Sequence, residues 1–361
     1  MSAPVAVLLS YRLGGDDGVS VESRKWEWAL RALGFTTRRV AAEFEDGLRP
    51  DDTWLGFLAI HPVPGARTEP DALSASLAGV ELVVVENLCS LPLNIDAART
   101  ASGVLSGFPG RVVFHHHDLP WERPALGHLT EFPPRRPGSL HVAISDQAKR
   151  ELRKRGIPAV TIRNSFDTQV TPGDRDGTRA QLGISSDDVV VLQPTRAIPR
   201  KEVPRGLQLA EQLAFLLPGR AVRYWLTGPA EDGYGATLDC VLSRAAVSVV
   251  QGRVERVADA YAAADLVVVP SSWEGFGNPV VEAMLAERPV VAGRYPALDE
   301  LRELGLRPLP LDDVAGVGEF VQQPDLGLLA HNREVAAREL ALNRLPARLE
   351  HVFRQIGWDH W

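Results

Sequence analysis

The chain has 361 residues, enough for about two domains of ordinary size. Apolar residues make up 45% and charged residues 24% of it, a composition that excludes a disordered, collagenous or coiled-coil protein. The net charge of −7 has the wrong sign for a protein that holds a nucleic acid backbone by its overall charge, so no nucleic acid partner is expected.

Two cysteines, Cys89 and Cys240, are too few for a disulfide framework, and they form no C-x-x-C motif for redox chemistry or zinc. The amino terminus has neither the basic leader nor the cleavage site of a signal peptide. No apolar run approaches the ~20 residues of a membrane span. We therefore expect a cytoplasmic protein without a transmembrane segment.

Short β-branched runs alternate with helical patterns along the whole chain, which predicts an α/β fold with parallel sheets covered by helices on both faces. In the first half, strands are predicted at residues 4–9, 37–41, 56–60, 81–85, 111–115, 141–144 and 159–162. A helix is predicted at residues 21–33, where Trp26, Leu30 and Leu33 share one stripe and Gly34 follows as a termination signal.

The segment 167–188 is polar and turn-rich and has no apolar periodicity, so it predicts the boundary between two domains. Further strands are predicted at residues 189–192, 222–226, 247–250, 266–269 and 289–292, and a terminal helix with one buried face at 344–357. We expect a first domain over residues 1–168 completed by 345–361, a linker over 169–187, and a second domain over 188–344.

The loop after the predicted strand 266–269 is the most informative segment, because ligands of open parallel sheets bind beyond the carboxyl ends of strands. Asn278 can cap the helix that follows, and Pro279 suits its first turn. The backbone N–H groups of that helix start would then face an anion such as a phosphate.

Two glutamates, Glu274 and Glu282, flank this loop with seven residues between them. Carboxylates accept hydrogen bonds from vicinal hydroxyls, and Gly275 and Gly277 allow the backbone to approach a ligand closely. The alternative is an ordinary strand-loop-helix turn in which Glu282 only favours the helix dipole.

The run Glu274-Gly-Phe-Gly-Asn-Pro-Val-Val-Glu282 resembles the glutamate-pair motif of retaining GT-B glycosyltransferases of family 4, the glycosyltransferase group 1 type. The resemblance covers nearly the whole chain. That family has two Rossmann-like, doubly wound domains facing a central cleft and a terminal helix that crosses back to the first domain, so the resemblance implies the GT-B fold here.

The resemblance also implies roles in donor binding. Glu282 would bind the ribose hydroxyls, and Glu274 the donor sugar. The donor sugar and phosphate would be held by the backbone of Gly275, Phe276, Gly277 and Asn278.

The segment from Arg196 to Lys201, after the strand 189–192, resembles the family's Arg and Lys pair that neutralises the donor diphosphate. Two fixed cations can offset the charge that develops on a leaving diphosphate, so no metal and no cofactor are expected. The alternative is a solvated basic turn, which the neighbouring Arg200 also fits. The nucleotide base is expected beside Arg253 and Val254, after the strand 247–250.

Three consecutive histidines end the strand 111–115. Zinc binding is one interpretation, but no other His or Cys pair has ligand spacing, so no metal is predicted. His117 and Asp118 resemble the segment in which the family has a histidine beside the transferred sugar, with His116 an alternative for that place. His115 is expected to be an ordinary core or surface histidine without a role in the site.

Two further loops follow strands of the first domain. Gly15 lies in a glycine-rich loop that can approach the donor diphosphate or the acceptor, and this loop matches the family's first loop. Asp17 in the same loop is assigned to acceptor binding or to helix capping. The segment from Glu86 to Pro92, which includes Asn87, could line the acceptor site or be a purely structural loop.

Together these features and the resemblance imply a metal-independent, retaining transferase that moves a hexose from a nucleotide diphosphate sugar to a hydroxyl of a small soluble acceptor, either a small molecule or a glycan. UDP-glucose is the first donor candidate on family frequency. The alternatives are a sugar-nucleotide epimerase or hydrolase of the same fold, and a two-lobed binding protein without chemistry. Four tryptophans of the first domain could stack on an acceptor ring or belong to the core: Trp26, Trp28, Trp54 and Trp121.

Overall fold

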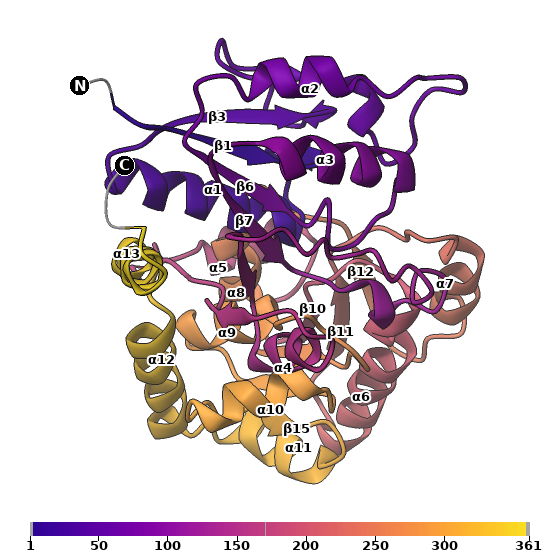
Figure 1. Ribbon diagram of the computed structural model, residues 1–361. Helices are drawn as coiled ribbons and strands as arrows, with labels where there is room; N and C mark the ends of the chain where they lie inside the picture. Colours follow the sequence, from indigo (N-terminus) through magenta and orange to yellow (C-terminus); the bar gives the residue numbers. More distant parts are fainter. Residues whose placement is uncertain (1–2, 170, 359–361) are drawn as a thin grey trace. The chain divides into compact units, whose positions relative to one another are not determined.

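A computed structural model describes residues 3–169 and 171–358 of the chain (Figure 1). The chain divides into two compact units. The first comprises Met1–Ser165 and Leu342–Trp361, and the second Phe166–Ala341. Each unit is built on one large parallel sheet, as the alternation of apolar strands and helical segments predicts.

The first unit has, in its described residues, a seven-stranded parallel sheet of order β5-β3-β1-β6-β7-β8-β9. Its strands are β1 (Val5–Leu9), β3 (Thr36–Ala41), β5 (Thr53–Trp54), β6 (Leu82–Glu86), β7 (Arg111–His116), β8 (Leu140–Ala143) and β9 (Ala159–Thr161). The short strands β2 (Arg12–Leu13) and β4 (Glu43–Phe44) pair separately. The helical segments are α1 (Gly18–Ala32), η1 (Gly56–Leu58), α2 (Pro70–Ser76), α3 (Ile95–Gly107), η2 (Pro120–Glu122), α4 (Asp146–Lys154), η4 (Leu342–Arg344) and α13 (Leu345–Gln355).

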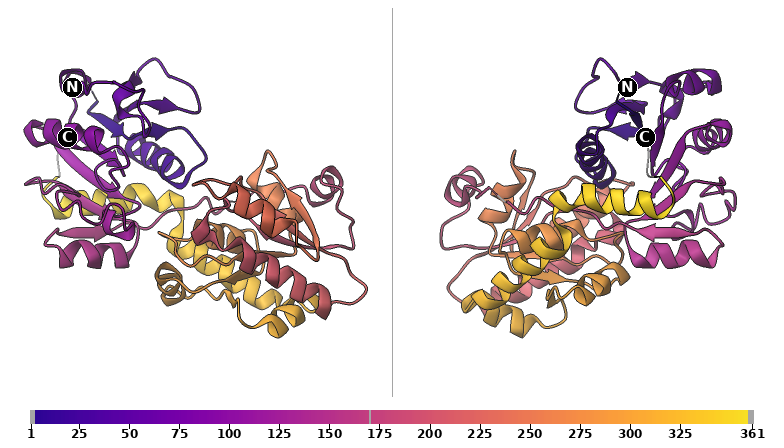
Figure 2. Two further views of the ribbon diagram at one scale, coloured as in Figure 1. Left: turned by 90° about the vertical axis from the view of Figure 1, so that its right-hand side faces the viewer. Right: turned by 60° about the vertical axis from the view of Figure 1, so that its left-hand side comes forward.

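Alternating side chains of the first sheet enter two separate cores. Val7 and Leu9 pack with α2 and α3 on one face, whereas Ala6 and Leu8 pack with α1 and α13 on the other. Both faces of the central strands are therefore apolar, which explains their continuous hydrophobic runs. The terminal helix α13, drawn in yellow in Figure 2, lies beside α1 and completes this unit.

The second unit has a six-stranded parallel sheet of order β12-β11-β10-β13-β14-β15 in its described residues. Its strands are β10 (Val189–Gln193), β11 (Val222–Leu226), β12 (Ser248–Gln251), β13 (Leu266–Val269), β14 (Val290–Ala292) and β15 (Leu309–Pro310). The helical segments are α5 (Arg175–Gln181), η3 (Pro199–Lys201), α6 (Val203–Leu216), α7 (Gly235–Leu242), α8 (Val257–Ala263), α9 (Asn278–Leu285), α10 (Pro296–Glu303), α11 (Val314–Gln322) and α12 (Leu326–Leu340).

Two predictions about the organisation of the chain are wrong. Residues 169–187, predicted as a linker, include α5, which packs against α8 and belongs to the second unit. The short helix is polar and too brief to show a 3.6-residue periodicity. The predicted strand at 56–60 is the 3-10 turn η1, and the sheet edge is β5 instead. The units divide after Ser165 and after Ala341, near the predicted boundaries at 168 and 344.

Candidate active site

The order of the strands reverses once in each sheet, and the predicted site residues gather at these two places. In the second unit the reversal lies between β10 and β13, and in the first unit between β1 and β6. Loops that follow the strands on either side of such a reversal diverge and leave room for a ligand. The two units are therefore described one after the other.

The loops after β10 and β13 are joined by a buried ion pair between Lys201 and Glu274. The Lys201 Nζ lies 2.5 Å from Oε1 and 2.6 Å from Oε2 of Glu274, and both residues are 8% exposed. Ser271 donates its hydroxyl to the same carboxylate at 2.6 Å. A solvated basic turn, the alternative left open for Lys201, is excluded by this burial.

Burial and charge act in opposite directions on this pair. Burial disfavours the Glu274 carboxylate, but Lys201, Arg200 and Ser271 outweigh it and hold its pKa below the usual value. Burial lowers the pKa of the Lys201 ammonium, against the attraction of Glu274. We conclude that Glu274 is ionised at neutral pH and that its negative charge holds the lysine in place.

Two arginines extend the positive charge of this site. Arg200 donates to the Trp273 carbonyl at 3.1 Å and lies 3.4 Å from Glu274 Oε2, so it belongs to the cluster rather than to an independent basic turn. Arg196 is one-third exposed and pairs with Glu231 at 2.6 Å. Three cations thus surround the loop in which the diphosphate is expected.

The start of α9 differs from the prediction in one detail. Asn278 is the first helical residue and not the cap; the cap is Gly277, which adopts a φ of +101°. A left-handed cap needs glycine, and a Cβ here would also lie 2.9 Å from the Tyr295 hydroxyl oxygen. Pro279 occupies the first turn, as predicted. Gly275 and Phe276 complete the loop, and the Phe276 ring stacks on Phe166.

Glu282 and the predicted base-binding residues lie further along this edge of the second sheet. Tyr261 of α8 donates its hydroxyl to Glu282 Oε2 at 2.7 Å, a partner that no sequence signal indicated. Arg253 is exposed and Val254 half-buried in the loop after β12. The preceding Gly252 carbonyl accepts from the Trp225 indole at 2.9 Å, which anchors that loop.

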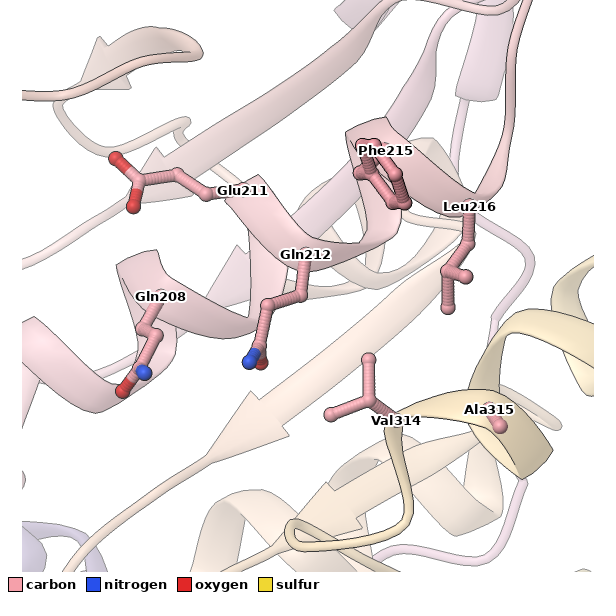
Figure 3. Close-up of a pocket in the computed structure, with 7 residues that line it drawn as sticks. All are labelled: Gln208, Glu211, Gln212, Phe215, Leu216, Val314 and Ala315. Carbon is pink, nitrogen blue, oxygen red and sulfur yellow. The ribbon is translucent and has the colours of Figure 1, made fainter.

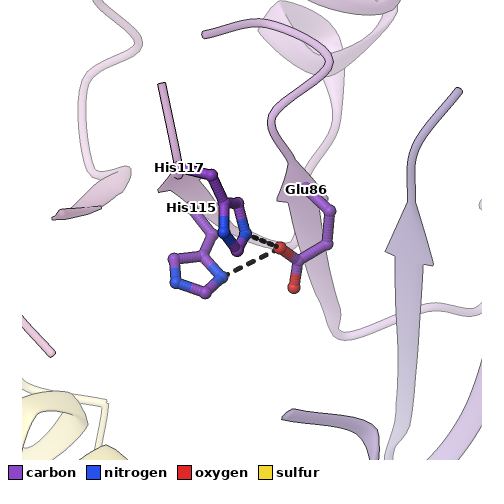
Figure 4. A group of neighbouring side chains, drawn as sticks. All are labelled: Glu86, His115 and His117. Atoms are coloured by element: carbon purple, nitrogen blue, oxygen red, sulfur yellow. Dashed lines mark hydrogen bonds and ion pairs between the residues drawn. The ribbon is translucent and has the colours of Figure 1, made fainter. Parts of the chain in front are cut away.

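In the first unit, a buried carboxylate joins two of the three histidines (Figure 4). Glu86 ends β6, and its Oε2 lies 2.9 Å from His115 Nδ1 and 2.8 Å from His117 Nε2. The two histidines share a face because they are two residues apart at the end of β7. The sequence placed Glu86 in a possible acceptor loop but did not indicate its contact with the histidines, although an acidic residue that ends an apolar strand is itself a signal of a buried partner.

This cluster titrates as a unit. Burial disfavours the Glu86 carboxylate, yet the two histidines lower its pKa to about 2. Burial opposes protonation of His117, but the hydrogen bond and charge of Glu86 outweigh it and raise the pKa of His117 above 6.5. His115 has its pKa lowered, chiefly by burial. We assign the shared positive charge to His117.

The ligand atoms of Glu86, His115 and His117 lie within 4.8 Å of one another, a spacing that could hold a metal ion. The His115 Nε2 atom has no hydrogen-bond partner among the described residues, whereas histidines that bind metals usually donate their second nitrogen to an acceptor. The expectation that no metal is needed stays a prediction, and its test is given below.

The structure distinguishes His116 from His117. Both ring nitrogens of His116 are engaged, Nδ1 with Ser90 Oγ at 2.5 Å and Nε2 with His141 Nδ1 at 3.0 Å, and the residue is fully buried. His117 is 8% exposed and uses Nε2 for Glu86. His117 is therefore the better candidate for contact with a sugar. His115 is buried against the Trp26 ring.

Asn87, Asp118 and Asp17 have clear structural roles. The Asn87 Oδ1 accepts the backbone N–H groups of His117 and Asp118, both at 3.1 Å, so it fixes the loop after β7. Asp17 caps α1 by accepting from Val19 N and from the N–H and hydroxyl of Ser20. Of the two roles left open for Asp17, capping is thus observed.

Gly15 lies in the loop after β1, and its carbonyl accepts from Arg24 at 2.6 Å. A Cβ at this position would lie 2.6 Å from the Glu45 carboxylate, so the backbone packs closely here. The loop faces the same edge of the sheet as Glu86, because all strands of the sheet are parallel.

Acid should destabilise the protein through the buried pair of His116 and His141. Burial lowers the pKa of both, that of His141 to about 4. Their contribution to stability is complete above the usual value of 6.5 and is lost as pH falls from there towards about 4. In urea titrations, the free energy of unfolding should fall by about 1.4 kcal/mol per pH unit for each histidine at most.

The variant His141→Asn should flatten this dependence between pH 6.5 and 4.5, and replacement of the exposed His128 by Asn is the matched control. Equal slopes for wild type and His141→Asn would show that the buried pair does not carry the effect.

A hollow of about 610 Å³ lies outside this site (Figure 3). It lies on the second unit between α6 and α11, and its lining includes Phe215, Leu216 and Val314 but none of the predicted site residues. The charged groups that suit a diphosphate are at the loops after β10 and β13 instead. No helix in the described part of the chain is long and apolar enough to cross a membrane.

Comparisons with known proteins agree with this geometry. The family model described as glycosyl transferases group 1 matches residues 200–344. Mannosylglucosylglycerate synthase of Thermotoga maritima is 28% identical over 94% of this chain and 97% of that protein. D-inositol 3-phosphate glycosyltransferase of Rhodococcus erythropolis is 31% identical over 54% of this chain and 43% of that protein.

Solved structures match along the full length. The crystal structure of Anabaena Alr3699/HepE in complex with UDP-glucose has a TM-score of 0.75 at 18% identity and covers 97% of this chain and 99% of that one. Sucrose-phosphate synthase from Thermosynechococcus elongatus has a TM-score of 0.73 at 18% identity, with 98% and 99% covered. The family model, the relatives and the shared fold together support a glycosyltransferase of the group 1, family 4 type, and the chain has the GT-B fold.

Proposed function

We propose that this glycosyltransferase is a retaining, metal-independent enzyme that transfers a hexose from a UDP-sugar to a hydroxyl of a polar acceptor. The observation that carries the proposal is the buried Lys201–Glu274 pair at the strand reversal of the second unit, flanked by Arg196 and Arg200. A diphosphate placed there would meet fixed cations in a largely dry site, where their effect on developing charge is strongest.

Each residue then has a role in the donor site. Arg196 and Lys201 stabilise the departing diphosphate, and the diphosphate competes with Glu274 for Lys201. Once Glu274 is released from Lys201, it accepts hydrogen bonds from the donor sugar. Glu282 accepts hydrogen bonds from the ribose hydroxyls. The backbone from Gly275 to Asn278 holds the sugar and phosphate. The loop that contains Arg253 and Val254 holds the nucleotide base.

The transfer itself needs no enzymic nucleophile in this proposal. The bond between the anomeric carbon and the diphosphate oxygen breaks, and the acceptor oxygen forms its bond on the same face of the sugar. The acceptor proton passes to a diphosphate oxygen. His117 contributes a charged hydrogen-bond donor to the sugar, and Glu86 is the positioning residue that holds His117 in that form.

The choice of UDP and of a polar acceptor draws on the comparisons. One structural neighbour is described in complex with UDP-glucose, and the names of two relatives specify a mannosylglucosylglycerate product and an inositol 3-phosphate substrate. The cytoplasmic location expected from the sequence stays a prediction.

Thermal unfolding in the presence of nucleotides tests the donor site directly. UDP at about 100 times its dissociation constant should stabilise the native state by about 2.7 kcal/mol, which raises the midpoint by a few degrees. GDP, ADP and dTDP serve as comparisons, each with EDTA and with added Zn²⁺. A shift with UDP that survives EDTA is the expected result.

Two results would contradict the proposal. A shift that EDTA abolishes would point to a metal, with Glu86, His115 and His117 as the first ligands to replace. No shift with any nucleotide would contradict the donor site and favour a protein that binds without catalysis. With UDP-glucose and acceptor, NMR of the product should show the anomeric configuration of the donor.

A further inference from the structure

A second hollow, of about 300 Å³, lies on the first unit at the β5 edge of its sheet. Ala42 directly follows β3, Trp54 ends β5, and Gly56 begins the turn η1, so the hollow lies beyond the carboxyl ends of these strands. The sheet is parallel throughout, and its carboxyl ends therefore share one edge. That is the edge where α/β sheets bind ligands.

Trp54 gives this hollow an aromatic wall. It is 62% exposed, the highest value among the tryptophans in the described chain. Trp26 is buried in the core, and the guanidinium of Arg155 covers Trp121 at 3.8 Å. Trp28 is also exposed, but it lies on α1 and lines neither hollow described here.

The indole ring of Trp54 is held in place by the backbone of Gly56. A Cβ built on Gly56 would lie 2.8 Å from Cη2 and 2.9 Å from Cζ2 of that ring, closer than any real side chain allows. The glycine thus lets one part of the ring rest on the backbone while the rest stays open to solvent. A fixed, exposed aromatic surface loses little conformational entropy when a ligand stacks on it.

The polar side chains that line the hollow are available for hydrogen bonds. The side chains of His61, Arg67 and Glu69 make no hydrogen bond or ion pair with other described residues. Together they offer donors and acceptors. The formal charges of Arg67 and Glu69 are opposite and cancel, so the hollow favours a neutral polyhydroxyl ligand over a phosphate or a carboxylate.

An aromatic surface beside balanced donors and acceptors suits a sugar ring, because a pyranose has an apolar C–H face and a rim of hydroxyls. Four strand spacings of about 4.8 Å separate β5 from β7, which ends at the histidines, a distance of about 19 Å. A ring in the hollow is therefore too far away to be the one whose hydroxyl reacts beside His117.

We propose that this hollow is a subsite for a neutral sugar unit of a glycan acceptor, stacked on Trp54 and distant from the reacting hydroxyl. The identification of the ligand as the acceptor rests on the proposed transferase function. The substrate class that follows is an oligosaccharide or extended glycoside rather than a monosaccharide.

The test measures the affinity of the full-length protein for neutral oligosaccharides of four to six glucose, xylose or N-acetylglucosamine units. Binding is monitored by Trp fluorescence and by calorimetry. Trp54→Ala should weaken binding about 2- to 12-fold, which is the fold-change that corresponds to about 0.5–1.5 kcal/mol of aromatic contact, whereas Trp54→Phe should retain most of the binding. Trp28→Ala is the matched control, since it removes an exposed tryptophan elsewhere.

Gly56→Ala provides an independent variant that keeps Trp54 but displaces its ring, and it should weaken binding as Trp54→Ala does. Inorganic phosphate should bind no more tightly to wild type than to Trp54→Ala. Oligosaccharide binding that is absent in wild type, or equal in Trp54→Ala and wild type, would overturn the subsite.

Failure of the subsite is distinguishable from failure of the proposed function by the nucleotide measurement. UDP should stabilise Trp54→Ala as much as wild type, because Trp54 has no part in the donor site. A UDP shift without Trp54-dependent glycan binding overturns only the subsite, and glycan binding without a UDP shift overturns only the donor assignment.

Discussion

Lys201→Ala is expected to lower the transfer rate by about 10²–10³-fold, the usual cost of removing one group that stabilises developing charge. UDP affinity should fall by about 10–100-fold, since hydrogen bonds between charged groups contribute about 1.5–3 kcal/mol. The physical reason is that Lys201 is held, buried, at the strand reversal where the diphosphate is expected. Steady-state kinetics and calorimetry with UDP measure the two effects.

Stability has to be separated from catalysis in this experiment. Lys201→Ala leaves the Glu274 carboxylate buried with Ser271 and the more distant Arg200 as its remaining partners, and breaking a buried ion pair costs about 3–5 kcal/mol. The double variant Lys201→Met with Glu274→Gln removes both charges and should recover much of the stability while staying inactive. A stable double variant without activity would assign the loss to the site itself.

The matched control is Lys149→Ala. Lys149 pairs with Asp146 on α4 and is about one-quarter exposed, so its removal should leave activity and UDP binding unchanged. Wild-type activity in a folded Lys201→Ala variant would contradict the role of Lys201.

Glu86→Gln is expected to have the second-largest effect, a loss of activity on the order of 10–100-fold near neutral pH. The amide keeps the size of the side chain but removes the charge that raises the pKa of His117. His117 would then be neutral at a pH where the wild-type histidine is protonated. The limb of the pH profile that belongs to His117 should therefore move to lower pH.

Glu86→Gln should also change how the stability of the fold depends on pH. A histidine with a raised pKa stabilises the fold fully below 6.5, and this contribution is lost as pH rises through the folded pKa. Wild type should therefore lose stability above pH 6.5 through this group, and Glu86→Gln should not. NMR of the imidazole carbons measures the pKa of His117 in both proteins.

Glu81→Gln is the control for this variant, because Glu81 immediately precedes β6 and holds the backbone N–H of Val5 at the other end of the strand. It should leave the pKa of His117 unchanged. If the pKa of His117 is unchanged in Glu86→Gln, Glu86 does not position His117, even if the transfer rate falls.

The sequence by itself determined the fold class, most strands and the loops that carry the site. Strands such as β10 and β13 are buried on both faces and therefore consist of continuous apolar, β-branched runs. Such a run can be recognised in the sequence before any contact is known. Once a strand has been located, the residues of the loop that follows it are known from the sequence. That is why Glu274 and Lys201, seventy residues apart, could be assigned to one edge of a sheet before their contact was known.

Short or polar elements could not be predicted in this way. The helix α5 is stabilised by its cap Asp174 and by packing on α8, which its own residues do not reveal. The turn η1 has the apolar composition of a strand, but the sheet edge is taken by Thr53 and Trp54.

Only the tertiary structure decided which charged groups are partners. Glu86 meets His117 and Tyr261 meets Glu282 because neighbouring strands and helices bring them together, and sequence spacing contains no information on such contacts. His116 and His117 are adjacent in the sequence and were interchangeable there. The structure separates them because successive side chains at the end of β7 point to opposite faces, one into the pair with His141 and the other towards Glu86.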